Sequence, residues 1–175
     1  MKLPTSKVVF DHEEISRTID EMAVAINERC RDGDWIAMCV LNGGLMFTSE
    51  LMKRVGVAMR LDSIRVSRYH NTKDGKDLLW HAYPELVITD QSILLMDDIF
   101  DEGQTLAALS QYFDAAGARQ VVSAVLVDKQ HDRKVSGFKP DFVGLTCEDA
   151  YVFGFGMDVG GYFRNLPDIR RLVDR

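Results

Sequence analysis

The residues from Asp97 to Thr105 combine side chains that suit sugar hydroxyls with a backbone that can approach a phosphate. Adjacent Asp97 and Asp98 can accept hydrogen bonds from vicinal ribose hydroxyls, directly or through water and a metal. Gly103 allows backbone to come close to a ligand, and Thr105 lies where a helix is expected to begin, so that free N–H groups and the helix dipole attract phosphate. The segment therefore predicts a site for a ribose that carries a phosphate.

Two other interpretations of this segment stay open on its residues alone. Asp97, Asp98 and Asp101 also fit the D-D-x-x-D metal motif of prenyl-diphosphate enzymes, which needs its carboxylates one turn apart on a helix. The apolar run before the motif and Gly103 after it argue against that reading, because they indicate a strand and a turn. An acidic loop that only caps a helix is the second alternative, since Asp is common at helix caps.

The elements that must position this segment alternate between helices and strands. A helix is expected from a cap at Asp11, with Glu14 three residues on, up to Gly33. The segments that follow are predicted as a strand at 36–41, a glycine break at 42–44, a helix through Val55, a strand at 61–69, a strand at 93–96 before the acidic loop, a helix ending at Gly117, and strands at 121–127, 142–145 and 152–155.

This order predicts an α/β fold with a mostly parallel twisted sheet flanked by helices, in a single domain of residues 1–175. Ligands of such sheets bind outside the carboxyl ends of the strands, where the segments 42–44 and 97–105 both fall. The polar stretch 71–77 is expected to be an exposed loop or hairpin tip, with a solvated turn and a mobile lid as equal readings.

Composition narrows the classes of function further. The chain of 175 residues has a net charge of -6, which disfavours nonspecific binding to nucleic acid. No segment has the length and apolarity of a signal peptide or a membrane span, so a cytoplasmic location is expected. Three cysteines with apolar neighbours, Cys30, Cys39 and Cys147, suit buried, reduced thiols rather than disulfides.

The stretch 93–106 resembles the phosphoribosyl-diphosphate signature of the type I phosphoribosyltransferases: a hydrophobic strand, two acids, two apolar residues, Asp, and Gly-x-Thr. Residues 40–44 resemble the pyrophosphate loop of the hypoxanthine-guanine branch of that family. Residues 139–144, 155–158 and 162–164 resemble its purine-binding end. The resemblance covers nearly the whole chain from Ile36 onward and implies the type I fold, with a small purine-binding hood from about 145–175 plus the N-terminal segment.

The resemblance also implies a reaction and the residues that serve it. The chain would transfer the 5-phosphoribosyl group from phosphoribosyl diphosphate to hypoxanthine or guanine, giving IMP or GMP and pyrophosphate, with Mg²⁺ as cofactor. Asp101 would be the general base at the purine N7. The phosphoribosyl group would be bound by Asp97, Asp98, Asp101, Glu102, Gly103, Gln104 and Thr105. Pyrophosphate would contact Leu41, Asn42, Gly43, Gly44 and Arg164, with a cis peptide between Leu41 and Asn42.

The remaining implied roles concern the purine, the metal and the lid. The purine would contact Lys129 at O6, Tyr151 by stacking, Val152 by its backbone, and Asp158. One water-linked Mg²⁺ would be held by Asp97 and Asp98, and a second Mg²⁺ on the diphosphate would be bound by Asp158. A lid over residues 69–80 would begin at Arg68 and Tyr69. The partners would be these small-molecule substrates, with no nucleic acid or membrane, and a homodimer or homotetramer is expected.

Three positions depart from the commonest pattern of the family: Glu102, where threonine is frequent, Asn42, where lysine is frequent, and Arg68, where serine is frequent. A carboxylate beside a phosphate is repelled by about 1 kcal/mol even in water. We therefore expect the side chain of Glu102 to point away from the phosphate, so that only its backbone binds.

Two alternative functions remain. One is phosphoribosyl transfer to xanthine or another purine such as adenine, although the ammonium of Lys129 can only donate and so favours an oxo group at position 6. The other is a non-catalytic regulator on the same fold that senses nucleotides and contacts RNA or DNA, against which the acidic charge argues.

Overall fold

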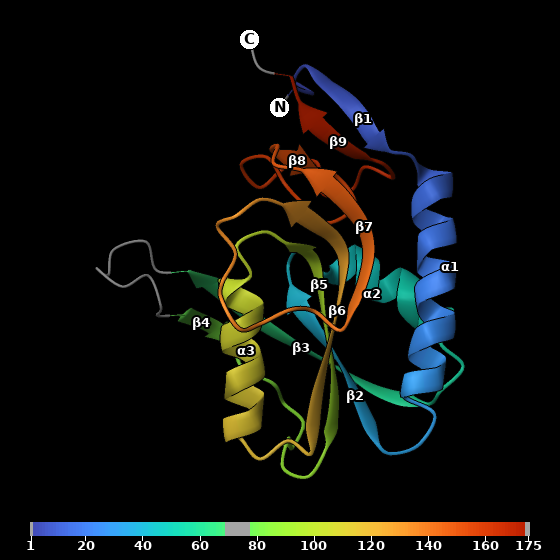
Figure 1. Cartoon of the computed structure of the whole chain (residues 1–175), viewed down its shortest axis with the longest axis vertical. Coiled ribbons are helices and arrows are strands. Elements are labelled where there is room, and N and C mark those ends of the chain that lie inside the picture. Colours follow the sequence, from blue (N-terminus) through green and yellow to red (C-terminus); the bar gives the residue numbers. More distant parts are fainter. Residues whose placement is uncertain (1, 69–77, 174–175) are drawn as a thin grey trace.

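A computed structural model describes residues 2–68 and 78–173. These ranges contain nine strands and three helices (Figure 1). In chain order they are β1 (Ser6–Phe10), α1 (His12–Arg29), β2 (Trp35–Leu41), α2 (Leu45–Met52), β3 (Met59–Arg68), β4 (Leu78–Ala82), β5 (Ser92–Phe100), α3 (Gln104–Ala115), β6 (Gln120–Gln130), β7 (Phe142–Glu148), β8 (Val152–Phe153) and β9 (Ile169–Leu172).

Six strands form a central sheet in the order β4-β3-β2-β5-β6-β7, and every pairing except the antiparallel β3–β4 pair is parallel. β2 and β5 occupy its middle, and their apolar runs are buried along nearly their whole length, as parallel strands covered on both faces must be. The predicted α/β class with a mostly parallel sheet is confirmed.

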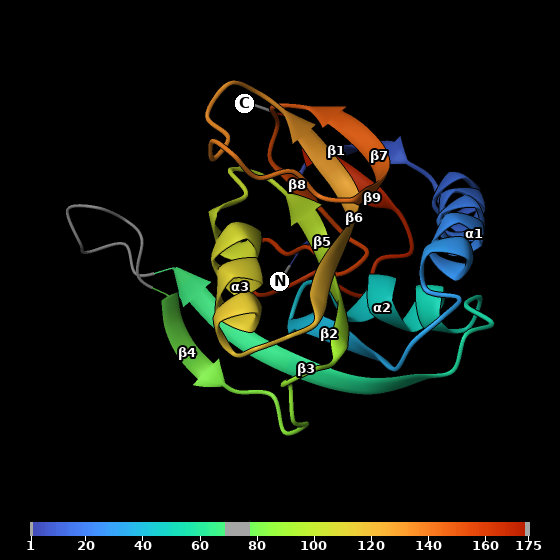
Figure 2. The same cartoon turned by 60° about the horizontal axis from the view of Figure 1, so that its bottom comes forward.

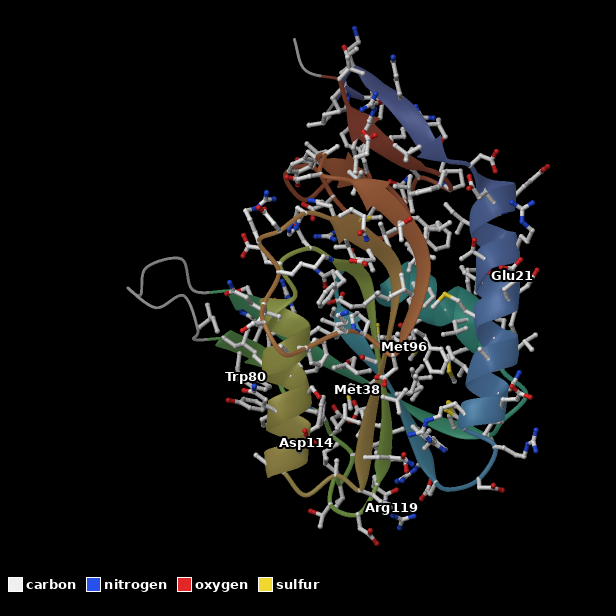
Figure 3. All side chains as sticks on the ribbon, viewed as in Figure 1. Glu21, Met38, Trp80, Met96, Asp114 and Arg119 are labelled. Carbon is white, nitrogen blue, oxygen red and sulfur yellow. The ribbon has the colours of Figure 1, made fainter. Side chains whose placement is uncertain are left out.

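Helices cover both faces of the central sheet, α1 and α2 on one side and α3 on the other (Figures 1 and 2). Each face has its own cluster of buried side chains. Ile19 and Phe47 belong to the cluster under α1 and α2, whereas Leu109 and Phe113 belong to the cluster under α3. Figure 3 places Met38 and Met96 in the middle of the sheet, between these layers.

A second, three-stranded sheet in the order β1-β9-β8 lies beyond the carboxyl ends of β5, β6 and β7, whose arrowheads point toward it in Figure 1. Arg119, just before β6, lies at the opposite end of the molecule (Figure 3). Both pairings in the small sheet are antiparallel. Because β1 pairs with β9, the first and last strands of the chain lie side by side.

Several element boundaries differ from the sequence-based prediction. α1 is capped by Asp11, whose side chain accepts from the N–H of Glu14 at 2.9 Å, as predicted, but it ends at Arg29 instead of Gly33. β5 continues to Phe100, so Asp97 and Asp98 lie in the strand and not in a loop after it. Pairing of β5 with β6 as far as Phe100 and Asp128 extends the strand past its apolar run.

Three strands were not predicted, namely β1, β4 and β9, because each is short and mixes exposed with apolar positions. α2 ends at Met52, before Val55. The strand expected at 152–155 ends at Phe153, because Gly154 has a φ of 99°, which turns the chain. The predicted loop at 71–77 lies outside the described residues.

The described residues include no helix that is both long and apolar enough to span a membrane. All three cysteines are buried and unpaired, as predicted.

Candidate active site

Two loops leave the middle of the central sheet side by side. Cys39 of β2 pairs with Met96 of β5, so the glycine loop after β2 and the acidic end of β5 emerge next to each other. The peptide bond between Leu41 and Asn42 is cis, as the family resemblance implied.

Glycines allow these loops to touch. A Cβ on Gly43 would lie 2.1 Å from a carboxylate oxygen of Asp98, and a Cβ on Gly44 would lie 2.8 Å from the carbonyl oxygens of Met96 and Val40. From the other side, a Cβ on Gly156 would lie 2.1 Å from the carbonyl oxygen of Gly43. Three segments remote in sequence therefore meet around the Asp98 carboxylate, with no room for larger residues.

The acidic segment then turns into α3 through Gly103, whose φ of 78° is the left-handed conformation that glycine adopts without strain. The ring of Phe100 fills the space where a Cβ would lie, 2.2 Å away. No side chain of the described residues caps the first turn of α3. The N–H groups of Gln104 and Thr105 at this helix start are left for water or an anion.

A cavity of about 230 Å³ opens between the ends of β5 and β6 and the segment from Tyr151 onward. It brings together the four residues predicted to bind the purine and two of the seven predicted to bind the phosphoribosyl group. Its lining is Asp98, Ile99, Asp101, Lys129, Tyr151, Val152, Met157 and Asp158. Tyr151 is 54% exposed, so a large part of its ring is available to a ligand.

Asp101 accepts hydrogen bonds on both carboxylate oxygens. Lys129 Nζ donates to Oδ2 at 2.9 Å, and His131 Nε2 lies 2.7 Å from Oδ1. Phe100, the last residue of β5, pairs with Asp128 of β6. Asp101 and Lys129 each follow one of these two residues, which explains why they lie side by side. Partial burial acts to raise the pKa of Asp101, but the bonds from Lys129 and His131 outweigh it and lower that pKa below its usual value.

The carboxylates of Asp101 and Asp149 and the ring of His131 place three ligand atoms within 4.8 Å of one another, as a metal site would. Each of these groups already has a partner. Asp101 binds Lys129, and Asp149 forms a two-pronged ion pair with Arg133 at 2.8 and 2.9 Å. We therefore describe the set as a hydrogen-bond network.

Asp97 and Asp98 differ electrostatically from Asp101. Burial, followed by the negative charge of Asp98, raises the pKa of Asp97 well above its usual value. Burial also raises the pKa of Asp98, although the positive charge of Arg164 acts in the opposite direction. Two adjacent, poorly solvated carboxylates offer the oxygen ligands that Mg²⁺ and Ca²⁺ prefer.

Arg164 and Asp158 form an ion pair with an N–O distance of 2.5 Å. Arg164 also donates to the carbonyl oxygen of Gly156 at 2.6 Å, and the hydroxyl of Tyr151 donates to the carbonyl oxygen of Asp158 at 3.0 Å. The two charged side chains that the sequence assigned to pyrophosphate and metal are thus each other's partners in this structure.

Not all predicted site residues meet in one cavity. Leu41 lines a separate, larger cavity of about 700 Å³ with residues of α2, β3 and β4. Arg68 is the last residue of β3, Tyr69 and the lid as far as residue 77 lie outside the described residues, and residues 78–80 belong to β4. Glu102 accepts a hydrogen bond from the side-chain amide of Gln104 at 3.3 Å, and its carbonyl oxygen accepts from the N–H of Val135.

The sequence analysis did not place His131 in the site. His131 lies two positions after Lys129 but just beyond β6, which ends at Gln130. The alternation of side chains along a strand therefore does not position it, and its contact with Asp101 depends on how the chain turns after β6.

Residues 6–160 match the phosphoribosyl transferase domain family. A hypoxanthine-guanine phosphoribosyltransferase of Bacillus subtilis is 33% identical, over 97% of this chain and 94% of its own. A solved hypoxanthine phosphoribosyltransferase of Trypanosoma cruzi has a TM-score of 0.90 at 26% identity, covering 99% of this chain and 94% of its own. A solved hypoxanthine phosphoribosyltransferase of Staphylococcus aureus has a TM-score of 0.90 at 24% identity, covering 95% of this chain and 91% of its own. The chain belongs to the phosphoribosyltransferase family.

Proposed function

We propose that this protein is a purine phosphoribosyltransferase that transfers the 5-phosphoribosyl group of phosphoribosyl diphosphate to hypoxanthine or guanine, giving IMP or GMP. The observation that carries the proposal is the cavity of about 230 Å³, where Asp101, Lys129 and Tyr151 meet beside Asp98. A carboxylate, an ammonium and an accessible aromatic ring suit the N7, the O6 and the face of a 6-oxopurine. The names of the relatives agree with this substrate class.

The proton step uses Asp101. As purine N9 forms its bond to C1 of the ribose, the bond from C1 to the diphosphate oxygen breaks and its electron pair leaves with pyrophosphate. The N7–H bond also breaks, its electron pair stays in the ring, and the proton moves to Asp101 Oδ2. Lys129 must first release that oxygen, to which it donates at 2.9 Å, and donate to the purine O6 instead. The lowered pKa of Asp101 keeps the group ionised, and so able to accept a proton, at neutral pH.

The ribose and phosphate are proposed to lie along the end of β5 and the start of α3. Asp97 and Asp98 would bind the ribose hydroxyls, and the backbone from Asp101 to Thr105 would bind the phosphate at a helix start that no described side chain caps. We expect Glu102 to contribute only its backbone. The lid over residues 69–80 would exclude water from the reaction.

The carboxylates of Asp97 and Asp98 offer oxygen donors for one Mg²⁺ and that of Asp158 for a second, and the bound ions would supply positive charge against the diphosphate. Arg164 would exchange its partner Asp158 for the departing pyrophosphate, which the N–H groups of Asn42 and Gly43 would also bind. The N–H of Gly44 already donates to the carbonyl oxygen of Val40 at 2.9 Å. The small sheet and the segment around Tyr151 would form the hood over the purine.

Buried, unpaired cysteines favour a reducing compartment such as the cytoplasm. We propose small molecules as the partners, and a homodimer or homotetramer as the assembly.

The proposal is tested by mixing the protein with Mg²⁺, phosphoribosyl diphosphate and each of hypoxanthine, guanine, xanthine and adenine, and following pyrophosphate release. We expect release with hypoxanthine or guanine at a rate at least tenfold above that with adenine, because Lys129 cannot accept a hydrogen bond from an amino group. If no base leads to pyrophosphate release, the proposed phosphoribosyltransferase activity is rejected. Gel shifts with RNA and DNA at two salt concentrations would then test the alternative function, a non-catalytic regulator that contacts nucleic acid.

A further inference from the structure

His131 contacts the proposed general base without lining the purine cavity. Its side chain is 3% exposed, and its Nε2 lies 2.7 Å from Asp101 Oδ1. His131 faces a different cavity, of about 800 Å³, which lies between the end of β6 and the loop that leads to β7. Any effect of His131 on a bound purine is therefore exerted through Asp101.

The hydrogen bonds of His131 define its tautomer. The backbone N–H of Arg133, which can only donate, lies 3.1 Å from Nδ1. Nδ1 must therefore carry a lone pair, and in the neutral ring the hydrogen is on Nε2. Nε2–H then donates to Asp101 Oδ1. A loop backbone thus orients the imidazole, and the imidazole orients the carboxylate.

The two oxygens of Asp101 have partners of different kinds. Lys129 binds Oδ2 and lines the purine cavity, so a purine can draw it away, whereas His131 binds Oδ1 from outside that cavity. When Lys129 moves to the purine O6, the bond from His131 remains. Without it, the carboxylate would be free to rotate about its Cα–Cβ and Cβ–Cγ bonds.

We propose that His131 is a positioning residue for the phosphoribosyl transfer, which holds Asp101 by Oδ1 so that Oδ2 meets the proton on purine N7. This inference rests on the proposed function. The proton passes from N7 to Oδ2, and the hydrogen on His131 Nε2 stays where it is.

The surroundings of the pair allow a pH profile to test this role. The other charged or titratable groups around Asp101 and His131 are Asp128 and Lys129 of β6, Cys147 of β7, and Asp132, Arg133, Lys134 and Asp149 of the loops. Burial raises the pKa of Cys147, and the bond to Asp149 raises that of Arg133. Asp149, whose pKa Arg133 lowers, lies outside the purine cavity. Asp98 also lines the purine cavity, and burial raises the pKa of Asp97 and of Asp98. These two groups titrate in the wild type and in every His131 variant alike, so a difference in the acid limb of kcat/KM between His131→Phe and His131→Gln reports on Asp101.

The experiment compares the wild type with His131→Phe, which removes the donor, and His131→Gln, whose amide restores a donor near the position of Nε2. His12→Phe, at the exposed start of α1, is the matched control. In His131→Phe we expect kcat to fall at least tenfold and the acid limb to move up by about one pH unit, since the carboxylate loses a donor. KM for phosphoribosyl diphosphate should stay within twofold. His131→Gln should recover most of both changes, and His12→Phe should match the wild type.

An acid limb that does not move in His131→Phe, or that moves equally in His131→Gln, would overturn the proposal. A wild type that forms no nucleotide would reject the proposed function instead. A long-range ¹H–¹⁵N NMR spectrum of the wild-type protein tests the tautomer even if the variants do not fold, because the chain has only 4 histidines. We expect His131 to be protonated on Nε2, and a ring protonated on Nδ1 contradicts the arrangement.

Discussion

Asp101 illustrates how single residues acquire a chemical role from their neighbours. Its position in the sequence resembles that of the family's general base. Its pKa, however, is lowered by two donors that the fold brings close: Lys129 Nζ lies 2.9 Å from Oδ2 and His131 Nε2 lies 2.7 Å from Oδ1. Lys129 could be predicted only through the family resemblance, because an isolated lysine is usually a surface residue. The contact with His131 could not be predicted, since it depends on how the chain turns after β6.

Replacing Asp101 with alanine removes the proposed proton acceptor and leaves the ribose-binding pair Asp97 and Asp98 in place. We expect kcat to fall by about a hundredfold or more, the usual range for loss of a general base. KM for phosphoribosyl diphosphate should change less than threefold. Steady-state kinetics with each substrate varied in turn measure both effects. A kcat equal to that of the wild type would remove Asp101 from the mechanism.

At the scale of elements, the site depends on loops and strand ends that pack without side chains between them. The sequence predicted the glycine loop at 42–44 and the helix after Gly103, because glycine breaks are visible in the pattern. It did not predict that β5 runs on to Phe100, because strand pairing, rather than an apolar pattern, extends β5 beyond Met96. The small strands β1, β4 and β9 were missed for a similar reason: their stability comes from pairing with distant segments.

Replacing Gly43 with alanine tests the contact between the glycine loop and the acid pair. The new Cβ would lie 2.1 Å from the Asp98 carboxylate, so that side chain must move. We expect KM for phosphoribosyl diphosphate to rise at least tenfold and the free energy of unfolding to fall by about 1–3 kcal/mol, as overpacking does. Kinetics and urea denaturation measure these changes.

Gly56→Ala is the matched control for that variant, since the nearest atom to its Cβ is 3.8 Å away. It should keep wild-type kinetics and stability. Equal effects of the two substitutions, or none at Gly43, would contradict the described packing.

The cap of α1 supports the fold away from the chemistry. Asp11→Ala removes the acceptor for the N–H of Glu14, so we expect the free energy of unfolding to fall by about 1 kcal/mol with kcat unchanged. In Asp11→Asn, which keeps an acceptor, the free energy of unfolding should fall by less. Urea denaturation distinguishes the two variants, and a loss of stability no greater for alanine than for asparagine would contradict the capping contact.

For the whole molecule, the order of strands and helices in the sequence was enough to predict a parallel sheet covered on both faces. The same rule placed both glycine loops at the carboxyl ends of the strands, where the structure has them. Periodicity could not predict the small sheet opposite these ends, because it pairs the first and last strands of the chain. That sheet and the segment near Tyr151 close one side of the cavity in which Asp101 and Lys129 meet.

The central claim is that a 6-oxopurine receives the phosphoribosyl group in this cavity. The most direct measurement is chromatography of the nucleotide formed from hypoxanthine, phosphoribosyl diphosphate and Mg²⁺ by the wild type and by Lys129→Met. We predict IMP from the wild type, and a kcat/KM for hypoxanthine at least tenfold lower in Lys129→Met, with little change in KM for phosphoribosyl diphosphate. Absence of IMP with folded wild-type protein, or equal kcat/KM in the two proteins, would contradict the claim.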